Sequence, residues 1–315
     1  MRSFLARNWF FLVLALGLTL ALLIPDWLQF LTWLDPRPMV AVALFLMAWG
    51  LPSRNLAKEL ARPWASLWAV AISYGLVPVG AWLIARTAPL PDAGIGLILM
   101  ACVPCTLGSA MLWTRMAGGN EATAMLALLL STCTSWLFTN SWLSVLAGAT
   151  IGIDESMRMM VELLMTLVVP VGIGQACRGS AVLASLADRR RRELGIVSQF
   201  LILAIIVKAA ARVGGNLQAG SSHLGAGMLI WSVIACTGLH LAALATGLLT
   251  SWLFGWDKTR RTAVAFSCSQ KTLPVALLLF DGYFQQDFPV AVVPLLFYHV
   301  GQLILDTPVA RRLAK

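Results

Sequence analysis

Two long apolar runs of the sequence, one in each half of the chain, are interrupted by small polar residues and a proline. The first interruption reads Val-Pro-Cys-Thr-Leu-Gly-Ser over residues 103–109, and the second reads Ser-Cys-Ser-Gln-Lys-Thr-Leu-Pro over residues 267–274. Their hydroxyl oxygens, together with carbonyls that a broken helix leaves free, are ligands for a hard cation such as sodium. We therefore take both interruptions as candidate ion-binding segments.

Lys271 is the residue of these segments with the strongest chemical consequence. An ammonium in the middle of an apolar span costs about 2.5–3.5 kcal/mol or more, so it is normally kept where it faces a cavity, forms a pair or titrates. Burial disfavours the charged form of lysine, which would let Lys271 release and take up a proton. The alternatives are that Lys271 reaches along its helix to the membrane surface or forms a fixed ion pair.

The composition identifies the environment in which these segments act. The chain has 315 residues, of which 59% are apolar and only 12% are charged. A soluble protein of this size needs roughly twice that share of charged residues to cover its surface. The net charge of +9 comes from short basic clusters between apolar runs, which argues against nucleic acid as a partner. We therefore expect a protein that crosses the lipid bilayer many times.

Apolar runs with few charges predict ten membrane spans in a single transmembrane domain covering residues 1–315. They are residues 9–25, 38–51, 64–85, 93–113, 122–148, 157–177, 194–211, 224–254, 261–280 and 288–305. The run 224–254 is long enough to raise the question of one span or two. Counted as one, it places 17 lysines and arginines in cytoplasmic segments against 4 outside, as the positive-inside rule requires. The expected location is the plasma membrane, most simply a bacterial inner membrane, with both termini cytoplasmic.

Ten spans divide into two halves of five, at about 1–150 and 151–315. An odd number per half means that the second half enters the membrane upside down, as in transporters built from inverted repeats. The two polar interruptions lie in the fourth span of each half. We therefore expect two discontinuous helices, with Pro104 and Pro274 at the breaks.

Several strings in these segments resemble the bile acid:sodium symporter superfamily, in particular its bacterial SBF-like branch. They are Pro104 to Ser109, Thr114-Arg-Met-Ala-Gly-Gly-Asn-Glu121, Ser131-Thr132, Ser269-Gln-Lys-Thr-Leu273, and Tyr298-His299 with Gln302. The resemblance covers nearly the whole chain. It implies a ten-helix fold in which spans 1, 2, 6 and 7 form a panel and spans 3–5 and 8–10 form a core. It also implies that broken helices four and nine cross at the midplane, with cations bound beside the crossing.

The resemblance further assigns possible sodium ligands. They are Ser109, Ser131, Thr132 and Gln270, and no other cofactor is expected. The family usually has an asparagine and a glutamate where this chain has Ala110 and Phe266, so the main anionic ligand is missing. Our hypothesis is that the Lys271 ammonium takes the place of a sodium ion. Ser269 and His299 complete the candidate ion and substrate site.

Charged residues elsewhere in the spans carry secondary expectations. Glu162 is the only carboxylate that falls well inside a predicted span, and we expect it to pair with Lys208 in the adjacent span. His240 is expected to be a hydrogen-bonded helix contact. His299 could titrate near neutral pH, which would offer proton coupling as the alternative to sodium.

These features together favour a secondary active transporter over an enzyme. The expected function is cation-coupled symport of a small organic anion, such as a bile-acid-like amphipathic acid, by alternating access. A passive channel is the alternative. An intramembrane Ser-His hydrolase with Ser109 as nucleophile would leave the matched breaks in the two halves unexplained.

Overall fold

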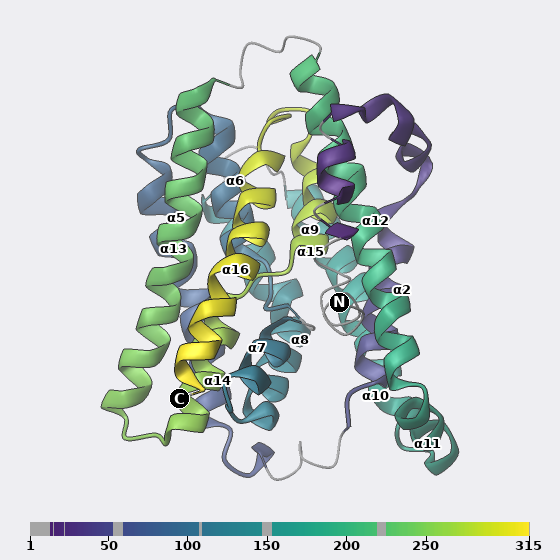
Figure 1. The fold of residues 1–315 in the computed structure, drawn as a ribbon, viewed down its shortest axis with the longest axis vertical. Coiled ribbons are helices and arrows are strands. Elements are labelled where there is room, and N and C mark those ends of the chain that lie inside the picture. The colour runs from purple at the N-terminus through teal and green to yellow at the C-terminus, as the bar shows by residue number, and fades with distance from the viewer. Residues whose placement is uncertain are drawn as a thin grey trace, which may run out of the picture.

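The computed structural model describes residues 13–14, 16–21, 23–52, 59–106, 109–146, 153–218 and 225–314. Within these ranges the chain forms helices joined by turns and contains no strand (Figure 1). Seven helices of the described chain are long and apolar enough to cross a membrane. They are Trp64–Ala85, Glu121–Leu146, Asp154–Cys177, Arg191–Arg212, Ala226–Leu253, Lys258–Phe284 and Val292–Leu313. Two shorter apolar helices, Pro36–Trp49 and Pro91–Cys102, accompany them.

The expected multi-pass helical membrane protein is thereby confirmed, whereas the count of ten spans stays a prediction. Residues 9–12, 15 and 22 of the span 9–25 lie outside the described residues, and the chain then forms a 3-10 helix, η1 (Pro25–Trp33). The run 224–254 is one helix, α13 (Ala226–Leu253), as the charge distribution predicted.

The fourth apolar run is broken as predicted. It forms α6 (Pro91–Cys102) and α7 (Ser109–Met116), and the residue after α6, Val103, has an extended backbone. Pro104 lies in the break, where its missing N–H removes no helical hydrogen bond.

The ninth run is broken in the same way. It forms α14 (Lys258–Ser269) and α15 (Leu273–Leu279), with extended backbone at Gln270 and Thr272, and Pro274 opens the second helix. The α14 N-terminus is capped by Asp257, whose side chain accepts from the N–H groups of Thr259 and Arg260. Burial alone would raise the pKa of Asp257, but these hydrogen bonds outweigh it and hold that pKa below its usual value.

The two breaks meet. The N–H of Thr272 donates to the carbonyl of Pro104 at 3.1 Å. In Figure 1, α6 and α15 lie in the upper half of the bundle, and α7 and α14 lie in the lower half. The broken helix Lys258–Phe284 is the innermost element, because its most apolar stretch is 100% buried, against 33–61% for the other candidate spans.

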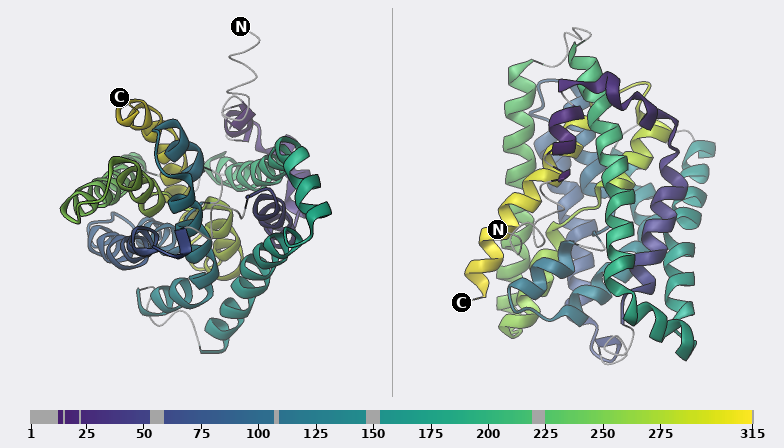
Figure 2. Two further views of the ribbon diagram at one scale, coloured as in Figure 1. Left: turned by 90° about the horizontal axis from the view of Figure 1, so that it is seen from below. Right: turned by 45° about the vertical axis from the view of Figure 1, so that its right-hand side comes forward.

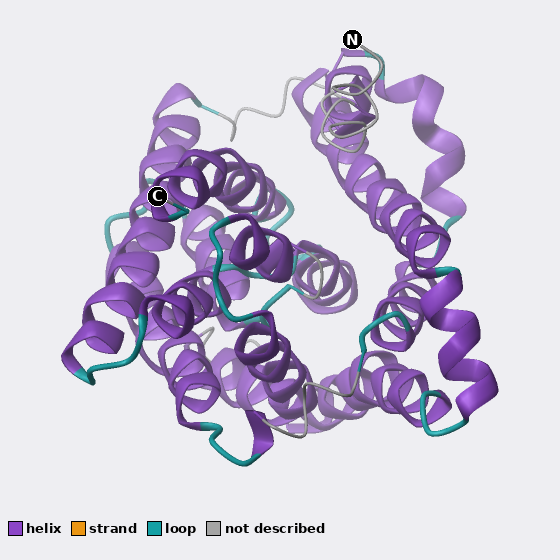
Figure 3. Ribbon diagram, turned by 60° about the horizontal axis from the view of Figure 1, so that its bottom comes forward, coloured by secondary structure: helices purple, strands orange, loops and turns teal. Residues whose placement is uncertain are grey.

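The described helices pack in two groups. The α12 group contains η1, α2 (Pro36–Trp49), α9 (Ile153–Leu163), α10 (Val169–Cys177), the short α11 (Ala181–Arg189) and α12 (Arg191–Gln218). The α14 group contains α4 (Trp64–Ala71), α5 (Val77–Ala85), α6, α7, α8 (Glu121–Leu146), α13, α14, α15 and α16 (Val292–Leu313). Viewed along the bundle, the α12 group lines one side of the α14 group (Figures 2 and 3).

Three of the helices contain a π turn, which adds one residue to the turn. The turns are η3 (Ile72–Leu76) between α4 and α5, η5 (Leu164–Val168) between α9 and α10, and η6 (Phe280–Phe284) after α15. Proline follows η3 and η5 as Pro78 and Pro170. A proline cannot donate to the preceding turn, so the helix must rearrange its hydrogen bonds there.

The close approach of α6 to the start of α16 generates a prediction. A Cβ on Gly96 would clash with the carbonyl oxygen of Ala291 and lie 3.0 Å from Cγ of Pro294. We expect Gly96→Ala to lower the free energy of unfolding by about 1–3 kcal/mol, as overpacking does, and so to lower the melting temperature of the purified protein. Gly238→Ala is the control, because its Cβ would meet nothing within 4 Å. Equal melting temperatures for the two variants would contradict this packing.

Candidate functional site

Lys271 lies at the point where the two breaks meet, and its side chain is fully buried. Its Nζ donates to the carbonyl oxygen and hydroxyl of Ser73, both at 2.8 Å, and to the carbonyl oxygen of Val103 at 3.1 Å. The ring of Tyr74 lies 5.3 Å from Nζ. The ion pairs of the described residues do not include Lys271. Its ammonium is therefore held by neutral oxygens of η3 and of the first break instead of by a carboxylate.

Pro78 explains why the carbonyl oxygens of Ser73 and Tyr74 have no partner in their own helix. In the π turn η3, the N–H of Val77 donates to Ile72. The next nitrogen belongs to Pro78 and has no hydrogen, which deprives the carbonyls of Ser73 and Tyr74 of helical partners. Lys271 takes the first carbonyl, and the indole N–H of Trp142 takes the second. Because of Pro78, the Ser73 carbonyl is thus available as an acceptor for Lys271 of the second break.

A polar chain runs through the second break. The Ser109 hydroxyl donates to Oε1 of Gln270, and Nε2 of Gln270 donates to Oδ2 of Asp306. The other carboxylate oxygen of Asp306 lies 2.8 Å from Nε2 of His240, whose Nδ1 lies 3.2 Å from the carbonyl oxygen of Ser269. Asp306 and His240 are both buried. The chain joins α7, the second break, α16 and α13.

Gln302 binds the backbone N–H and carbonyl groups of Lys271, which have no helical partner in the break. Its Oε1 accepts from the Lys271 N–H, and its Nε2 donates to the Lys271 carbonyl, both at 3.0 Å. The same Nε2 lies 3.0 Å from Nδ1 of His299. Since an unpaired peptide group is costly in a membrane, Gln302 stabilises the break, and His299 reaches it only through Gln302.

The hydroxyls predicted on span five act differently from one another. Ser131 Oγ accepts from the N–H of Cys105 at 2.8 Å and so pairs a backbone group of the first break. Thr132 instead donates to the carbonyl of Leu128 in its own helix. Ser269 does the same with Ala265, although its carbonyl accepts from the Tyr298 hydroxyl at 2.9 Å.

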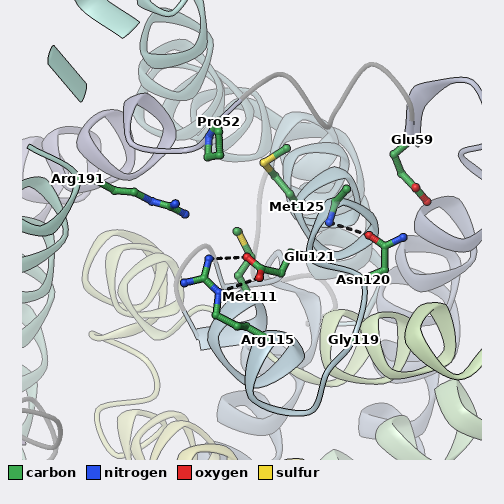
Figure 4. Close-up of a pocket in the computed structure, with 10 residues that line it drawn as sticks. Pro52, Glu59, Met111, Arg115, Gly119, Asn120, Glu121, Met125 and Arg191 are labelled. Atoms are coloured by element: carbon green, nitrogen blue, oxygen red, sulfur yellow. Dashed lines mark hydrogen bonds and ion pairs between the residues drawn. The ribbon is translucent and has the colours of Figure 1, made fainter. Parts of the chain in front are cut away.

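A cavity of about 570 Å³ lies between the two helix groups, at the end of the bundle that carries Arg115, Arg178, Arg189–Arg192 and Arg260, which we call the arginine-rich end. Figure 4 shows its lining: Pro52, Glu59, Met111, Arg115, Gly119, Asn120, Glu121, Ala122, Met125 and Arg191. The guanidinium of Arg115 binds both carboxylate oxygens of Glu121, at 2.8 and 2.5 Å. Arg191 enters the cavity from the α12 group.

The string from Thr114 to Glu121 builds the turn that borders this cavity. Gly118 has φ of +68°, which favours glycine, and a Cβ on Gly119 would lie 2.8 Å from Thr114 and 2.9 Å from Thr262. Asn120 Oδ1 accepts from the N–H of Ala122 at 2.9 Å and so caps α8.

The whole sequence, compared with known protein families, matches one family model over residues 8–315, the SBF-like CPA transporter family. This chain belongs to the SBF-like CPA transporter family. The expected resemblance is thereby confirmed, and the protein is a membrane transporter, not an enzyme.

Curated relatives of this SBF-like transporter carry related names. Sodium/bile acid cotransporter 7 of Danio rerio is 27% identical over 85% of this chain and 80% of its own length. The protein of the same name from Mus musculus is 24% identical over 85% of this chain and 79% of its own length. Putative symporter YfeH of Escherichia coli is 24% identical over 99% of this chain and 94% of its own length.

Two sequence predictions about charges in this transporter are wrong. Glu162 does not pair with Lys208: it binds Arg37 and accepts from the Tyr283 hydroxyl at 2.7 Å, while Lys208 lies 3.6 Å from Asp281. Asp281 was overlooked because its charge ended the predicted span 261–280, whereas the helix continues to Phe284.

Glu162 is also not the only carboxylate deep inside a helix. The predicted span 288–305 stopped at Asp306 because of its charge, but α16 continues to Leu313 and contains Pro308. Asp306 is fully buried, and His240 and Gln270 supply hydrogen-bond partners for its two carboxylate oxygens. The sequence did contain one signal. Asp306 follows Gln302 by four residues, which places both on one face of a helix, and Gln302 is part of the motif that carries the resemblance.

The predicted sodium ligands of the transporter have hydrogen-bond partners of their own. Among the four, a direct contact joins Ser109 to Gln270, and the missing carboxylate position is occupied by the buried ring of Phe266. The carboxylate that reaches Gln270 comes from Asp306 instead. Asp306 of α16 thus brings a carboxylate to the polar chain in a region where the family usually has one at position 266.

The buried contacts of Asp306 generate a prediction. Asp306→Leu leaves His240 and the Gln270 amide without their acceptor, so we expect the free energy of unfolding to fall by about 3 kcal/mol. Asp306→Asn keeps one acceptor oxygen and should lose less. Thermal unfolding of the purified variants measures both. Thr307→Val is the neighbouring control, since Thr307 donates only to Leu303 of its own helix. A loss no larger than that of the control would contradict the contacts.

Proposed function

We propose that the protein is a cation-coupled secondary transporter that moves a small organic anion across the membrane by alternating access. The observation that carries the proposal is the meeting of two broken helices around a buried ammonium. Thr272 and Lys271 of one break bind Pro104 and Val103 of the other. Paired broken helices are typical of transporters with a central ion or substrate site.

The architecture that we propose has ten spans in two inverted halves, at about 1–150 and 151–315. In it, the α12 group is the panel and the α14 group is the core. The arginine-rich end is cytoplasmic under the positive-inside rule, as are both termini, and a bacterial inner membrane fits the chain.

An organic anion as substrate is supported by size and charge. The cavity of about 570 Å³ falls within the range of small-molecule sites. Arg115 and Arg191 line it from the two groups, so an anion between them would contact Arg191 and compete with Glu121 for the Arg115 guanidinium. The names of the relatives point to bile-acid-like acids.

The coupling cation is sodium or the proton. The relatives' names favour sodium. In this chain, Ala110 and Phe266 stand at family ligand positions, and the Lys271 ammonium already supplies a positive charge among the carbonyls of the crossing. A lysine that titrates during transport would make the proton the coupling ion.

Uptake by proteoliposomes tests the function. We expect taurocholate or another amphipathic acid to accumulate above its external concentration when an inward sodium or proton gradient is imposed. Uptake that only equilibrates would identify a passive channel and contradict the proposal. The gradient that drives accumulation identifies the coupling ion.

Lys271→Met tests the role of the ammonium. We expect uptake to fall at least ten-fold, because the positive charge at the crossing is lost. Met fills a similar volume, but the Ser73 and Val103 carbonyls lose their donor, so thermal unfolding of the purified variant is measured to separate lost transport from lost fold. Lys258→Met, at an exposed position, is the matched control and should transport normally. Unchanged uptake and ion dependence in Lys271→Met would remove Lys271 from the mechanism.

A further inference from the structure

Asp281 joins the two helix groups at the end of the bundle opposite the arginine-rich end. It lies in η6, and its carboxylate oxygens are 2.5 Å from Arg212 and 3.6 Å from Lys208. Both cations belong to α12 and are one helical turn apart. The exposed fractions of the three side chains are 21%, 25% and 10%. One carboxylate of the α14 group therefore binds two cations of the α12 group in a partly dehydrated setting.

Further bonds join the groups at this same end. The Tyr283 hydroxyl, also in η6, donates to Glu162 of α9 at 2.7 Å, and Ser156 of α9 donates to Asn140 of α8 at 3.0 Å. Glu162 is in turn paired with Arg37 of α2. Arg37 is thus occupied within its own group, which leaves Lys208 and Arg212 as the cations that Asp281 must neutralise.

Ion pairs at the arginine-rich end have a different arrangement. Each of those formed by described residues stays inside one group: Arg115 with Glu121, Arg178 with Asp188, Arg190 with Glu193, and Arg260 with Glu59 and Asp257. The cavity between the groups is about 570 Å³ there, against about 360 Å³ beside Asp281. Among the described residues, the Asp281 end therefore has ion pairs that join the two groups, and the larger of these two cavities lies at the arginine-rich end.

We propose that Asp281, Lys208 and Arg212 form an ion-pair gate, and that a carboxylate-bearing substrate opens the gate by replacing Asp281 on the two cations. Opening this end moves Asp281 away with the α14 group and leaves two poorly hydrated cations unpaired, which is strongly unfavourable. An anion in the 360 Å³ cavity, which Lys208, Arg212 and Asp281 line, supplies the lost negative charge.

The replacement of Asp281 by a substrate carboxylate, which we call the exchange, rests on the proposed transport of an organic anion. It adds a location at which that anion acts. Lys208 and Arg212 both face Asp281, whereas Asp35, the other carboxylate that lines this cavity, accepts from the Arg37 N–H, so the two cations favour anions over neutral solutes. Guanidinium and carboxylate also form directional paired hydrogen bonds, which suits a carboxylate as the replacement.

Distances between spin labels on the full-length purified protein test the gate. One pair, Trp33→Cys with Gln286→Cys, reports on the Asp281 end, and a second pair, Val182→Cys with Leu253→Cys, reports on the arginine-rich end; all four positions are exposed. Cys133 and Cys177, which are not buried, are replaced by serine. We expect Asp281→Asn to raise the ratio of long to short distances at the Asp281 end at least ten-fold and to shorten distances at the other end.

Two variants control this result. Asp188→Asn breaks an ion pair within the α12 group and should leave both distributions unchanged. The exchange Asp281→Arg with Arg212→Asp, combined with Lys208→Gln to remove the like charge beside position 281, restores an ion pair of reversed polarity and should return the wild-type distribution, which also shows that the charge-altered chain folds. An unchanged distribution in Asp281→Asn, or an equal change in Asp188→Asn, overturns the gate.

Added anions test the exchange step. Benzoate, succinate and cholate are compared with neutral benzamide on the wild-type protein and on Lys208→Gln with Arg212→Gln. We expect at least one carboxylate to raise the open population of the wild type and to lose this effect in the double variant. No response to any carboxylate, an equal response to benzamide, or an unaltered response in the double variant overturns the exchange.

The gate and the proposed function fail separately. If Asp281→Asn opens the gate but proteoliposomes equilibrate solutes passively, the gate stands and cation-coupled transport is wrong. If wild-type proteoliposomes accumulate an organic acid and Asp281→Asn leaves the distances unchanged, transport stands and the gate is wrong.

Discussion

Peptide groups that a broken helix leaves without partners must be satisfied inside the protein, because the hydrocarbon of a bilayer offers no water. This constraint organises the centre of the molecule. Around the second break, Gln302 binds both backbone groups of Lys271, and Tyr298 binds the carbonyl of Ser269. Ser131 serves the first break in the same way. The polar side chains of spans five and ten are therefore explained first by the backbone that they pair.

The same constraint places the charge. Pro78 frees a carbonyl in span three and the first break frees another, and the Lys271 ammonium binds both. The crossing of the two breaks therefore holds a buried cation among carbonyl oxygens. On the other side of the break, Asp306 supplies a carboxylate through Gln270. The Lys271 ammonium and the Asp306 carboxylate thus lie on different elements, the second break and α16, so a movement of one element relative to the other changes the contacts of both groups.

Much of this could be predicted from the chain. Apolar runs with few charges predict membrane helices, and prolines with small polar residues at matched positions predict the breaks at 103–109 and 267–274. The rule that a charge ends a span was less reliable. It is correct for charges that face water, but Asp306 is hydrogen-bonded and Asp281 is ion-paired to residues distant in sequence. No local pattern reports such a partner, which is why the pairing of Glu162 with Lys208 was predicted wrongly.

The sequence by itself determined the class of protein, the positions of the breaks and the residue types available there, because hydropathy, proline and charge act through neighbours along the chain. Only the tertiary structure decided which oxygens hold Lys271, which carboxylate reaches Gln270 and which cations face Asp281. Those choices depend on residues 36 to 198 positions apart along the chain, which only the packing of helices brings together. In a membrane, an unpaired charge or peptide group is too costly to leave, so the packing of helices decides what each polar residue does.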